Sequence, residues 1–432
     1  MQIIAQKPPL NIPIQILKLL SLQHHQKLII VKNTFLSERI TAMSESATLA
    51  MTKKSREMKA AGIDVINLSI GEPDFFVPNF IKEAAKKAVD DNFSFYPPVA
   101  GYPQLRQAIS NKLKRDNDLE YTPEQIVVST GAKQAICNVF LACLDPGDEV
   151  IVPSPYWVSY TELIKLAGGV PVYIQTSIED DFKVTPEQIE KVITPKTKAF
   201  IFCAPNNPSG MLYTYEELKA LAAMFGKYPN ILLVSDEIYE LINFDGKTYS
   251  IGIFPEVKDR TVTINGLSKA FAMPGWRLGY SAAPLELSKA IEKVQGQVTS
   301  AANAIAQIAG VTALQVDPNQ CEDLQMMKKA FRERRDYVVK RLGDIPGFKP
   351  NMPMGAFYVF PDVQQLYGKS DGSTVINNDN DLCIYILNKA HVALVPGSAF
   401  GDSNCIRFSY ATSMENLTLA MDRIEKTIKE LK

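Results

Sequence analysis

The sequence predicts an α/β protein in which a mostly parallel sheet is covered on both faces by helices, with a smaller α+β domain in the same chain. From about residue 120, short strand-like runs alternate with helix-like segments, which is the pattern of parallel βαβ units. Runs such as residues 231–234 (ILLV) do not alternate apolar with polar residues, as expected for strands that are buried on both faces. After about residue 312 the helical segments become longer and more charged.

The first half of the alternation can be followed along the chain. Residues 126–129 form an apolar run that predicts a strand, and residues 132–144 form a helical segment that the Asp-Pro-Gly sequence at 145–147 ends. Residues 149–153 predict the next strand, and a helix follows it as far as residue 166. The repeated order of strand and helix indicates that these strands lie parallel in one sheet.

Further elements are predicted from helix-start signals and β-branched runs. Thr185 and Gln188 have capping-box spacing, with Pro186 at the first helical position, and Thr214 and Glu217 repeat that spacing at the start of a helix that ends near residue 225. The remaining predicted strands are 199–203, 231–234 and 261–264, and the long helices of the C-terminal part are 326–341 and 417–431.

These elements divide the chain into predicted domains. A large α/β domain is expected near residues 79–312, and a smaller one would combine residues 36–78 with residues 313–432. Residues 1–35 hold four lysines, three prolines and no acidic residue, and they show no secretory cleavage site. We expect them to be a poorly ordered extension.

Composition excludes several classes of protein. The 432 residues carry 46 Lys plus Arg against 47 Asp plus Glu, a balance that argues against a nucleic-acid-binding or polybasic membrane surface. No apolar run approaches the roughly 20 residues of a membrane span. Six cysteines without a CxxC pair are typical of a reducing compartment, so a cytoplasmic location is expected. Three histidines leave little room for a His-based triad or a His-ligated metal, and no metal site is predicted.

Four polar clusters fall where predicted strands end, which is where ligands bind in open α/β sheets. The clusters are residues 129–133 (STGAK), 206–210 (NNPSG), 235–239 (SDEIY) and 268–280 (SKAFAMPGWRLGY). Taken alone, the first is explained as well by an ordinary strand-to-helix turn and the second by a tight turn. A helix N-cap would account for Asp236 in the third cluster, but it leaves Tyr239 unexplained.

The fourth cluster carries the strongest chemical signal. Lys269 is flanked by apolar and small residues, a setting that lowers the pKa of an amine and suits a Schiff base. Arg277 offers a fork of donors that matches a phosphate. Asp236 ends a run of aliphatic residues, where a carboxylate needs a cationic partner.

In combination these clusters resemble a known family. The motifs NNPSG, SDEIY, SKAFAMPGWRLGY and CIRFSYA, in that order, make the chain similar from about residue 36 onward to the class I/II aminotransferases of pyridoxal-phosphate fold type I. The resemblance is closest to the bacterial-type aspartate aminotransferase subgroup, which also contains prephenate aminotransferases. It implies a large domain with a mostly parallel seven-stranded sheet, a smaller α+β domain, and pyridoxal 5'-phosphate as the cofactor.

The resemblance also implies roles around the cofactor ring. Lys269 would bond covalently to the cofactor aldehyde and then act as general base and acid. Asp236 would pair with the pyridine nitrogen, so that the ring accepts electrons, and Tyr239 and Asn207 would bind the phenolic oxygen. Trp157 would stack on the ring. Lys269, Asp236 and Tyr239 are therefore the expected catalytic residues.

The cofactor phosphate and the dimer are implied together. Arg277 and the backbone N–H groups of Ala132 and Lys133 would hold the phosphate. Tyr96, in YPPVAGYP, would reach the phosphate of a neighbouring subunit, which implies a homodimer with shared active sites.

The substrate site follows from the same resemblance. Arg407 would clamp the substrate α-carboxylate with two parallel bonds, with Gly71 of LSIGEPDF close to it. Lys133 and Thr48 match positions that are associated with recognition of a second carboxylate, although an exposed helix lysine is the simpler reading of Lys133. The substrate-binding set implied in this way is Gly71, Trp157, Asn207, Arg407, Lys133 and Thr48.

The expected activity is transfer of an amino group between aspartate or glutamate and 2-oxoglutarate or oxaloacetate. Prephenate, also a dicarboxylate, is a further candidate substrate. The alternative is another fold type I enzyme, either an aromatic aminotransferase or a carbon–sulfur lyase.

Residues 76–78 (FVP) replace the Asp-Thr-Pro that family members often carry, which leaves the fine substrate preference open. A ligand-sensing regulator is disfavoured because about 35 residues are too few for a winged helix, and a dinucleotide-binding oxidoreductase because no GxGxxG follows a strand.

Overall fold

The computed structural model describes residues 35–44, 47–244 and 247–432. The chain divides into two compact units, residues 1–43 and 44–432. In the first unit the described residues form one short helix, α2 (Glu38–Thr41). The expectation for residues 1–35 therefore lies almost entirely outside the described residues. All elements discussed below belong to the second unit.

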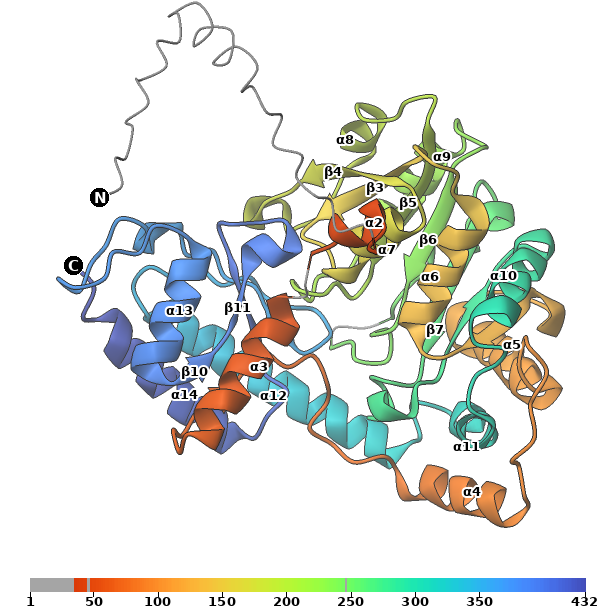
Figure 1. Ribbon diagram of the computed structural model, residues 1–432, viewed down its shortest axis with the longest axis horizontal. Coiled ribbons are helices and arrows are strands. Elements are labelled where there is room, and N and C mark those ends of the chain that lie inside the picture. The colour runs from red at the N-terminus through yellow and green to blue at the C-terminus, as the bar shows by residue number, and fades with distance from the viewer. Residues whose placement is uncertain (1–34, 45–46, 245–246) are drawn as a thin grey trace, which may run out of the picture. The chain divides into compact units, whose positions relative to one another are not determined.

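A seven-stranded sheet is the centre of the second unit (Figure 1). Its strands lie in the order β2-β8-β7-β6-β5-β3-β4, and only β8 runs antiparallel to its neighbours. The bounds are β2 (Ile126–Ser129), β3 (Glu149–Ser154), β4 (Val170–Gln175), β5 (Thr197–Cys203), β6 (Leu232–Asp236), β7 (Thr261–Gly266) and β8 (Gly279–Ala282). The prediction of a mostly parallel, seven-stranded sheet is confirmed.

Both faces of the sheet are buried, and alternate strand residues enter two different cores. On β5, Ala199, Ile201 and Cys203 pack into the larger core, which includes residues of α6 and α7. Phe200 and Phe202, between them, pack with residues of α9 into the second core. Because side chains of a strand alternate between faces, an uninterrupted apolar run is what two covered faces require.

The helices of this part connect the strands and cover them. They are α4 (Asn79–Asp90), α5 (Pro103–Asn117), α6 (Ala132–Cys143), α7 (Ser159–Leu166), α8 (Pro186–Glu190), α9 (Tyr215–Phe225), α10 (Leu285–Val298) and α11 (Ala304–Gln315). The capping boxes predicted at Thr185 and Thr214 are both formed, with each threonine side chain accepting from a backbone N–H of the first turn. These two helix starts are therefore local properties of the sequence.

The N-terminal and C-terminal segments of the second unit pack together. Strand β1 (Ile66–Asn67) pairs in parallel with β10 (Val392–Ala393), and α3 (Ala47–Ala60) lies against the same C-terminal elements (Figure 1). A second small sheet is antiparallel, in the order β11 (Val395–Pro396), β12 (Ile406–Ser409), β9 (Tyr358–Val359). The helices here are α12 (Glu322–Asp344), α13 (Asp379–Ala390) and α14 (Met414–Ile428). The exact domain boundaries stay a prediction.

Two strands of the large sheet have no counterpart in the sequence-based assignment. Strand β4 (VPVYIQ) is an edge strand with a proline at residue 171, and an internal proline argues against a central strand even within an apolar run. Strand β8 (GYSA) has no β-branched residue and is formed by pairing with β2 and β7 on either side. Tertiary pairing decides β8.

Short 3-10 helices complete the chain. They are η1 (Pro123–Gln125), η2 (Ile178–Asp180), η3 (Ile251–Ile253), η4 (Lys258–Arg260), η5 (Pro274–Trp276), η6 (Gln364–Leu366) and η7 (Gly397–Phe400).

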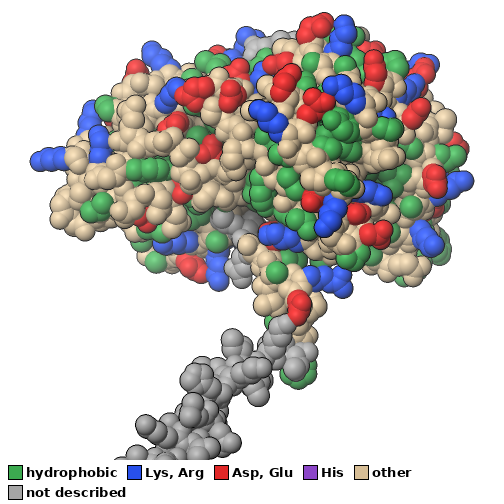
Figure 2. Space-filling view, turned by 90° about the horizontal axis from the view of Figure 1, so that it is seen from above, with side chains coloured by type: hydrophobic (Ala, Val, Ile, Leu, Met, Phe, Trp, Pro, Cys, Tyr) green, Lys and Arg blue, Asp and Glu red, His purple; other side chains and the backbone are tan. Residues whose placement is uncertain are grey.

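On the face shown in Figure 2, basic and acidic side chains intermingle, in keeping with the balanced charge of the chain. Within the described residues, no helix combines the length and apolar character needed to cross a membrane.

Candidate active site

A cavity of about 420 Å³ lies where β5 and β6 end and the segments following β1, β2 and β7 converge. This is the edge at which ligands bind in open α/β sheets. Eleven of the twelve site residues predicted from the sequence line it: Thr48, Gly71, Ala132, Lys133, Trp157, Asn207, Asp236, Tyr239, Lys269, Arg277 and Arg407. The twelfth, Tyr96, does not. Residues separated by up to 359 positions in the chain thus meet in one cavity, as we predicted from the polar clusters at the strand ends and the family resemblance.

Lys269 enters the cavity from the turn that follows β7. Burial disfavours the charged ammonium and lowers the pKa of Lys269 to about 8, with the nearby Arg407 and Arg277 acting in the same direction. Its Nζ donates a hydrogen bond to the backbone oxygen of Gly71. A sizeable fraction of this amine is therefore neutral near pH 7 to 8 and able to act as a nucleophile or base.

Asp236 is the last residue of β6 and is 3% exposed. Its Oδ2 accepts a hydrogen bond of 2.5 Å from the hydroxyl of Tyr160, and its Oδ1 accepts one of 3.3 Å from the N–H of Ile238. Burial raises the pKa of Asp236 to about 6, while these two hydrogen bonds and Lys269 oppose the rise. A buried carboxylate that stays mostly ionised at neutral pH is suited to hold a cationic ring nitrogen.

The start of α6 forms a cradle with Arg277. Gly131 precedes the helix with φ 84°, and a Cβ at this position would lie 2.3 Å from Nη2 of Arg277. Only glycine therefore lets the guanidinium approach the helix start this closely. Backbone N–H groups at a helix N-terminus and an arginine fork together make an anion site, and α6 has 12 residues to carry the dipole.

Arg407 is a buried cation without an acidic partner. Its Nη1 donates to Oδ1 of Asn207 at 2.9 Å and its Nη2 donates to the backbone oxygen of Ser69 at 2.7 Å. The Nε atom is buried and has no hydrogen-bond partner. Within residues 35–44, 47–244 and 247–432, no carboxylate forms an ion pair with Arg407, which leaves its charge available to an anionic ligand.

Aromatic side chains complete the walls. The hydroxyls of Tyr239 and Tyr358 share a hydrogen bond of 2.9 Å. Lys133 places its Nζ 5.0 Å from the centroid of the Trp157 ring, and burial together with Arg277 lowers the pKa of Lys133. Lys133 is an exposed helix residue, but its amine lies against the Trp157 ring in the wall of the cavity.

Comparison with known proteins identifies the family. The family described as "Aminotransferase class I and II" matches residues 63–424. The chain belongs to the class I and II aminotransferases. An aspartate aminotransferase of Rhizobium meliloti has a crystal structure that aligns with a TM-score of 0.89 and 40% identity, over 92% of this chain and 99% of that one. The structure titled "aspartate aminotransferase from Thermus thermophilus with maleate" aligns with a TM-score of 0.85 and 42% identity, over 91% and 99%.

Curated relatives agree with the solved structures. A "bifunctional aspartate aminotransferase and glutamate/aspartate-prephenate aminotransferase" of Petunia hybrida is 47% identical over 399 residues, 92% of this chain and 83% of that protein. An "aspartate/prephenate aminotransferase" of Nitrosomonas europaea is also 47% identical, over 90% of this chain and 98% of that protein. The resemblance inferred from the four motifs is thereby confirmed, together with the type I fold.

Class I and II aminotransferases depend on pyridoxal phosphate, and this aminotransferase has the groups to hold it. The glycine at the start of α6 leaves a cradle for the phosphate beside Arg277. Asp236 is buried where a ring nitrogen needs a counter-charge, and Lys269 supplies an amine whose pKa of about 8 permits bonding to an aldehyde. The donor set fits the cofactor in charge and in chemistry.

The sequence-based prediction missed nine residues that line this aminotransferase's cavity, among them Glu72, Tyr160, Cys203 and Tyr358. Tyr160 follows Trp157 by three residues, a spacing that could have placed both side chains at one helix start. Cys203 is the last residue of the predicted strand 199–203 and could have been found from that position. Tyr358 lies on β9, and no local signal connects it with Tyr239.

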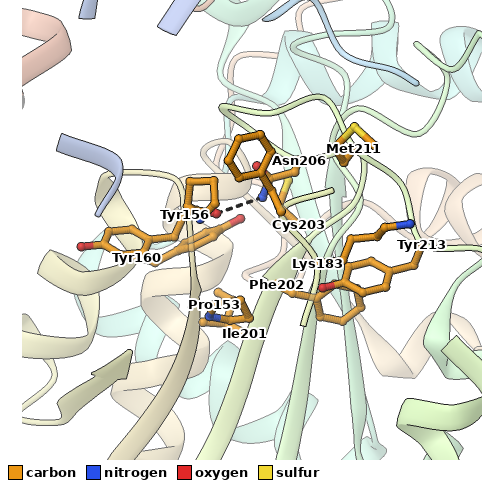
Figure 3. Close-up of a pocket in the computed structure, with 12 residues that line it drawn as sticks. Pro153, Tyr156, Tyr160, Lys183, Ile201, Phe202, Cys203, Asn206, Met211 and Tyr213 are labelled. Atoms are coloured by element: carbon orange, nitrogen blue, oxygen red, sulfur yellow. Dashed lines mark hydrogen bonds between the residues drawn. The ribbon is translucent and has the colours of Figure 1, made fainter. Parts of the chain in front are cut away.

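A second, smaller cavity lies beside the first. Tyr160 and Cys203 line both, and Figure 3 shows the smaller one with Asn206, whose side chain donates to the backbone oxygen of Pro155 at 3.3 Å. Its volume of about 10 Å³ is no more than one water molecule occupies. The larger cavity is therefore the one that can take the cofactor and a substrate.

Proposed function

We propose that this chain is an aspartate aminotransferase that moves an amino group between aspartate or glutamate and 2-oxoglutarate or oxaloacetate, with prephenate as a further substrate. One observation carries the proposal. The same cavity contains the amine of Lys269, with a pKa of about 8, and the buried Arg407, which forms no ion pair with a described carboxylate. The names and identities of the relatives, 45–47% in curated proteins, support the substrate. A site that held only the cofactor would have no use for Arg407.

Pyridoxal phosphate, when bound, supplies a ring that accepts electrons as the bond between Cα and its hydrogen breaks. Asp236 keeps a proton on the ring nitrogen, because the carboxylate is buried and faces the cavity. Tyr239 and the amide nitrogen of Asn207 bind the phenolic oxygen, while Oδ1 of Asn207 stays with Arg407. Trp157 orients the ring from one face. Each of these roles is a proposal that the side-chain positions support.

Lys269 moves the proton at the substrate Cα. Its neutral form accepts the proton, and a pKa of about 8 makes the reverse donation feasible near neutral pH. Gly71, whose backbone oxygen accepts from Nζ, helps to orient the amine.

Arg407 binds the substrate α-carboxylate and so orients the Cα–H bond. Its guanidinium is 2% exposed, is held by Asn207 and Ser69, and stacks 4.5 Å from the centroid of the Tyr358 ring. A cation that is already desolvated and immobilised loses little entropy when it binds a carboxylate. This arrangement favours a substrate with an α-carboxylate over a simple amine.

Lys133 and Thr48 bind the second carboxylate. Both line the cavity, and Lys133 is the cation nearest to the Trp157 ring. The related Thermus thermophilus structure was determined with maleate, which is a dicarboxylate. A dicarboxylic amino acid would thus meet one cation at each end, which supports aspartate, glutamate and prephenate over an aromatic amino acid.

We also propose that the working form is a homodimer with shared sites. Tyr96 is 94% exposed and Phe95 is 83% exposed, on a loop that does not line the cavity of its own chain. Adjacent exposed aromatic residues are typical of protein interfaces. A second copy would bury them and bring Tyr96 to the neighbouring phosphate.

The six free cysteines support a reducing compartment, the cytoplasm.

An assay of the purified protein tests the activity. Loaded with pyridoxal phosphate, it should transfer the amino group of aspartate or glutamate to 2-oxoglutarate, oxaloacetate or prephenate, with far lower rates for phenylalanine as donor. Product formation should require a 2-oxo acid acceptor. Release of ammonia or a thiol without an acceptor would instead establish a lyase, and equal rates for phenylalanine and aspartate would refute the dicarboxylate assignment.

A further inference from the structure

The side chain of Tyr160 connects two parts of the cofactor site. Tyr160 lies in the first turn of α7 and is 1% exposed. Its hydroxyl is the side-chain donor to Asp236, at 2.5 Å. Its ring meets that of Trp157 edge-on, with centroids 5.4 Å apart and an interplanar angle of 84°. One residue therefore contacts both the acid expected at the ring nitrogen and the indole expected on the ring face.

The carboxylate of Asp236 has few other groups to stabilise it. The titratable groups that face it are Tyr160 from α7, Cys203 from β5 and Lys269 from the turn after β7. The thiol of Cys203 is fully enclosed and stays uncharged because burial raises its pKa. Lys269 is the one cation among them, and its amine must be neutral before it can accept a proton or attack an aldehyde.

The hydroxyl of Tyr160 is therefore the side-chain donor to Asp236 that remains throughout the reaction. Burial and the neighbouring Asp236 raise the pKa of Tyr160 well above its ordinary value, so the hydroxyl keeps its proton and donates it in the hydrogen bond. A hydrogen bond to a charged group in a buried site is stronger than one between neutral groups. The hydrogen bond also restricts rotation of the Asp236 side chain, because Oδ2 accepts from Tyr160 while Oδ1 accepts from the N–H of Ile238.

We propose that Tyr160 is a positioning residue that holds the Asp236 carboxylate ionised and aimed at the pyridine nitrogen. The inference rests on the proposed function, since it assigns a ring nitrogen to Asp236. It predicts that removal of the hydroxyl weakens cofactor binding and shifts the ionisation of the site, while the ring contact with Trp157 persists.

The variant Tyr160→Phe removes the hydroxyl and keeps the aromatic ring. Its apoprotein should bind pyridoxal phosphate about tenfold or more weakly, measured by equilibrium dialysis, because a hydrogen bond to a buried charge is lost. In the loaded protein kcat should fall while KM for aspartate changes by no more than about twofold, since Arg407 is untouched. Tyr121→Phe is the matched control, because the buried Tyr121 donates to the backbone oxygen of Thr261 at 3.2 Å, away from the cavity.

A double-mutant cycle separates positioning from general damage. In the Asp236→Asn background, Tyr160→Phe should change the cofactor dissociation constant by no more than about twofold, because the charge that it served is absent. If Tyr160→Phe weakened cofactor binding equally in both backgrounds, the effect would be structural and the proposal would be wrong. Unchanged binding in the wild-type background would overturn it as well.

A measurement without cofactor keeps this inference separate from the proposed function. The pKa of Asp236 is about 6 in the fold against 3.8 ordinarily, so ionisation lowers the stability of the apoprotein as pH rises between these values. Loss of the Tyr160 hydroxyl raises the pKa further, so the stability deficit of Tyr160→Phe should grow as pH rises above 6. A deficit that is constant from pH 5 to pH 8 would contradict the role of Tyr160. Failure of the wild-type protein to bind pyridoxal phosphate would instead refute the proposed function.

Discussion

At the scale of single residues, burial acts in opposite directions on the two ionisable groups that face each other in the cavity. It lowers the pKa of Lys269 to about 8 and raises the pKa of Asp236 to about 6, because a low-dielectric surrounding disfavours charge of either sign. Between these values the acid is mostly ionised and the amine retains a substantial neutral fraction above pH 7. Burial therefore has two useful effects: Asp236 is available as a counter-ion and Lys269 as a base.

The first prediction concerns the amine of Lys269 in the apoprotein. Its acetylation by acetic anhydride should rise with pH through a midpoint near 8, because the neutral amine is the reactive form. A short unstructured lysine peptide, with a pKa of about 10.4, serves as the reference. Mass spectrometry of the two peptides measures both profiles in one sample. Coincident midpoints would show that the site does not perturb Lys269.

The second prediction concerns substrate choice. Lys133→Ser should reduce kcat/KM for aspartate by about tenfold or more, because a cation in the wall of the cavity that meets a carboxylate is removed. The value for phenylalanine should change much less. Steady-state kinetics with both amino acids measures the ratio, and Lys293→Ser serves as the surface control. Equal losses for both substrates would assign Lys133 to the cofactor phosphate or to the structure.

At the scale of elements, the anion site at the start of α6 depends on two residues. They are Gly131, which forms the turn before the helix, and Arg277, which lies far along the chain. Gly131 adopts φ 84° and ψ 160°, a conformation that is essentially restricted to glycine. Arg277, itself at φ 55° after η5, donates to the backbone oxygen of Pro274 at 2.8 Å and to that of Thr130 at 3.4 Å. Two segments with unusual backbone conformations therefore meet where the phosphate is expected.

The third prediction tests this junction. Gly131→Ala should cost about 1–3 kcal/mol of stability through its backbone conformation. It should also weaken cofactor binding, because the new Cβ would displace Arg277. Gly147→Ala is the matched control, since Gly147 also has a positive φ of 92° but its Cβ would have no atom within 4 Å. Thermal unfolding and cofactor titration of both variants separate the two effects; equal cofactor affinity would show that the cradle does not hold the phosphate.

At the scale of the whole molecule, the single chain presents eleven predicted site residues in its cavity and leaves Tyr96 exposed outside it. In the proposed homodimer, another copy of the chain would complete the site by supplying this loop. In a twofold symmetric dimer each subunit would give and receive the same residue.

The fourth prediction is complementation between two defective variants. Lys269→Ala lacks the reactive amine and Tyr96→Ala lacks the tyrosine, so each alone should have low activity. After unfolding and refolding together, about a quarter of the wild-type activity should return, because about half of the dimers are mixed and each mixed dimer has one intact site. Sedimentation measures the dimer. No gain over the separate variants would show that Tyr96 acts within its own chain or not at all.

Much of the fold could be predicted because it depends on local signals. The strands at 126–129 and 199–203 are apolar runs, and the helices after Thr185 and Thr214 begin at capping boxes that the structure forms. Strand β8 could not be predicted, because neighbouring strands rather than its own residues stabilise it, whereas Pro171 argued against a strand at β4.

By itself, the sequence determined the family, the type of fold and eleven of the residues that gather in the cavity, because the short motifs and the strand-to-helix alternation are local patterns. Only the tertiary structure decided how those residues act on one another. The pairing of Tyr160 with Asp236, the contact of Lys133 with Trp157 and the isolation of Arg407 from any acid depend on distances between segments that are far apart in the chain. Burial, which sets the pKa values of Lys269 and Asp236, exists only after those segments have packed.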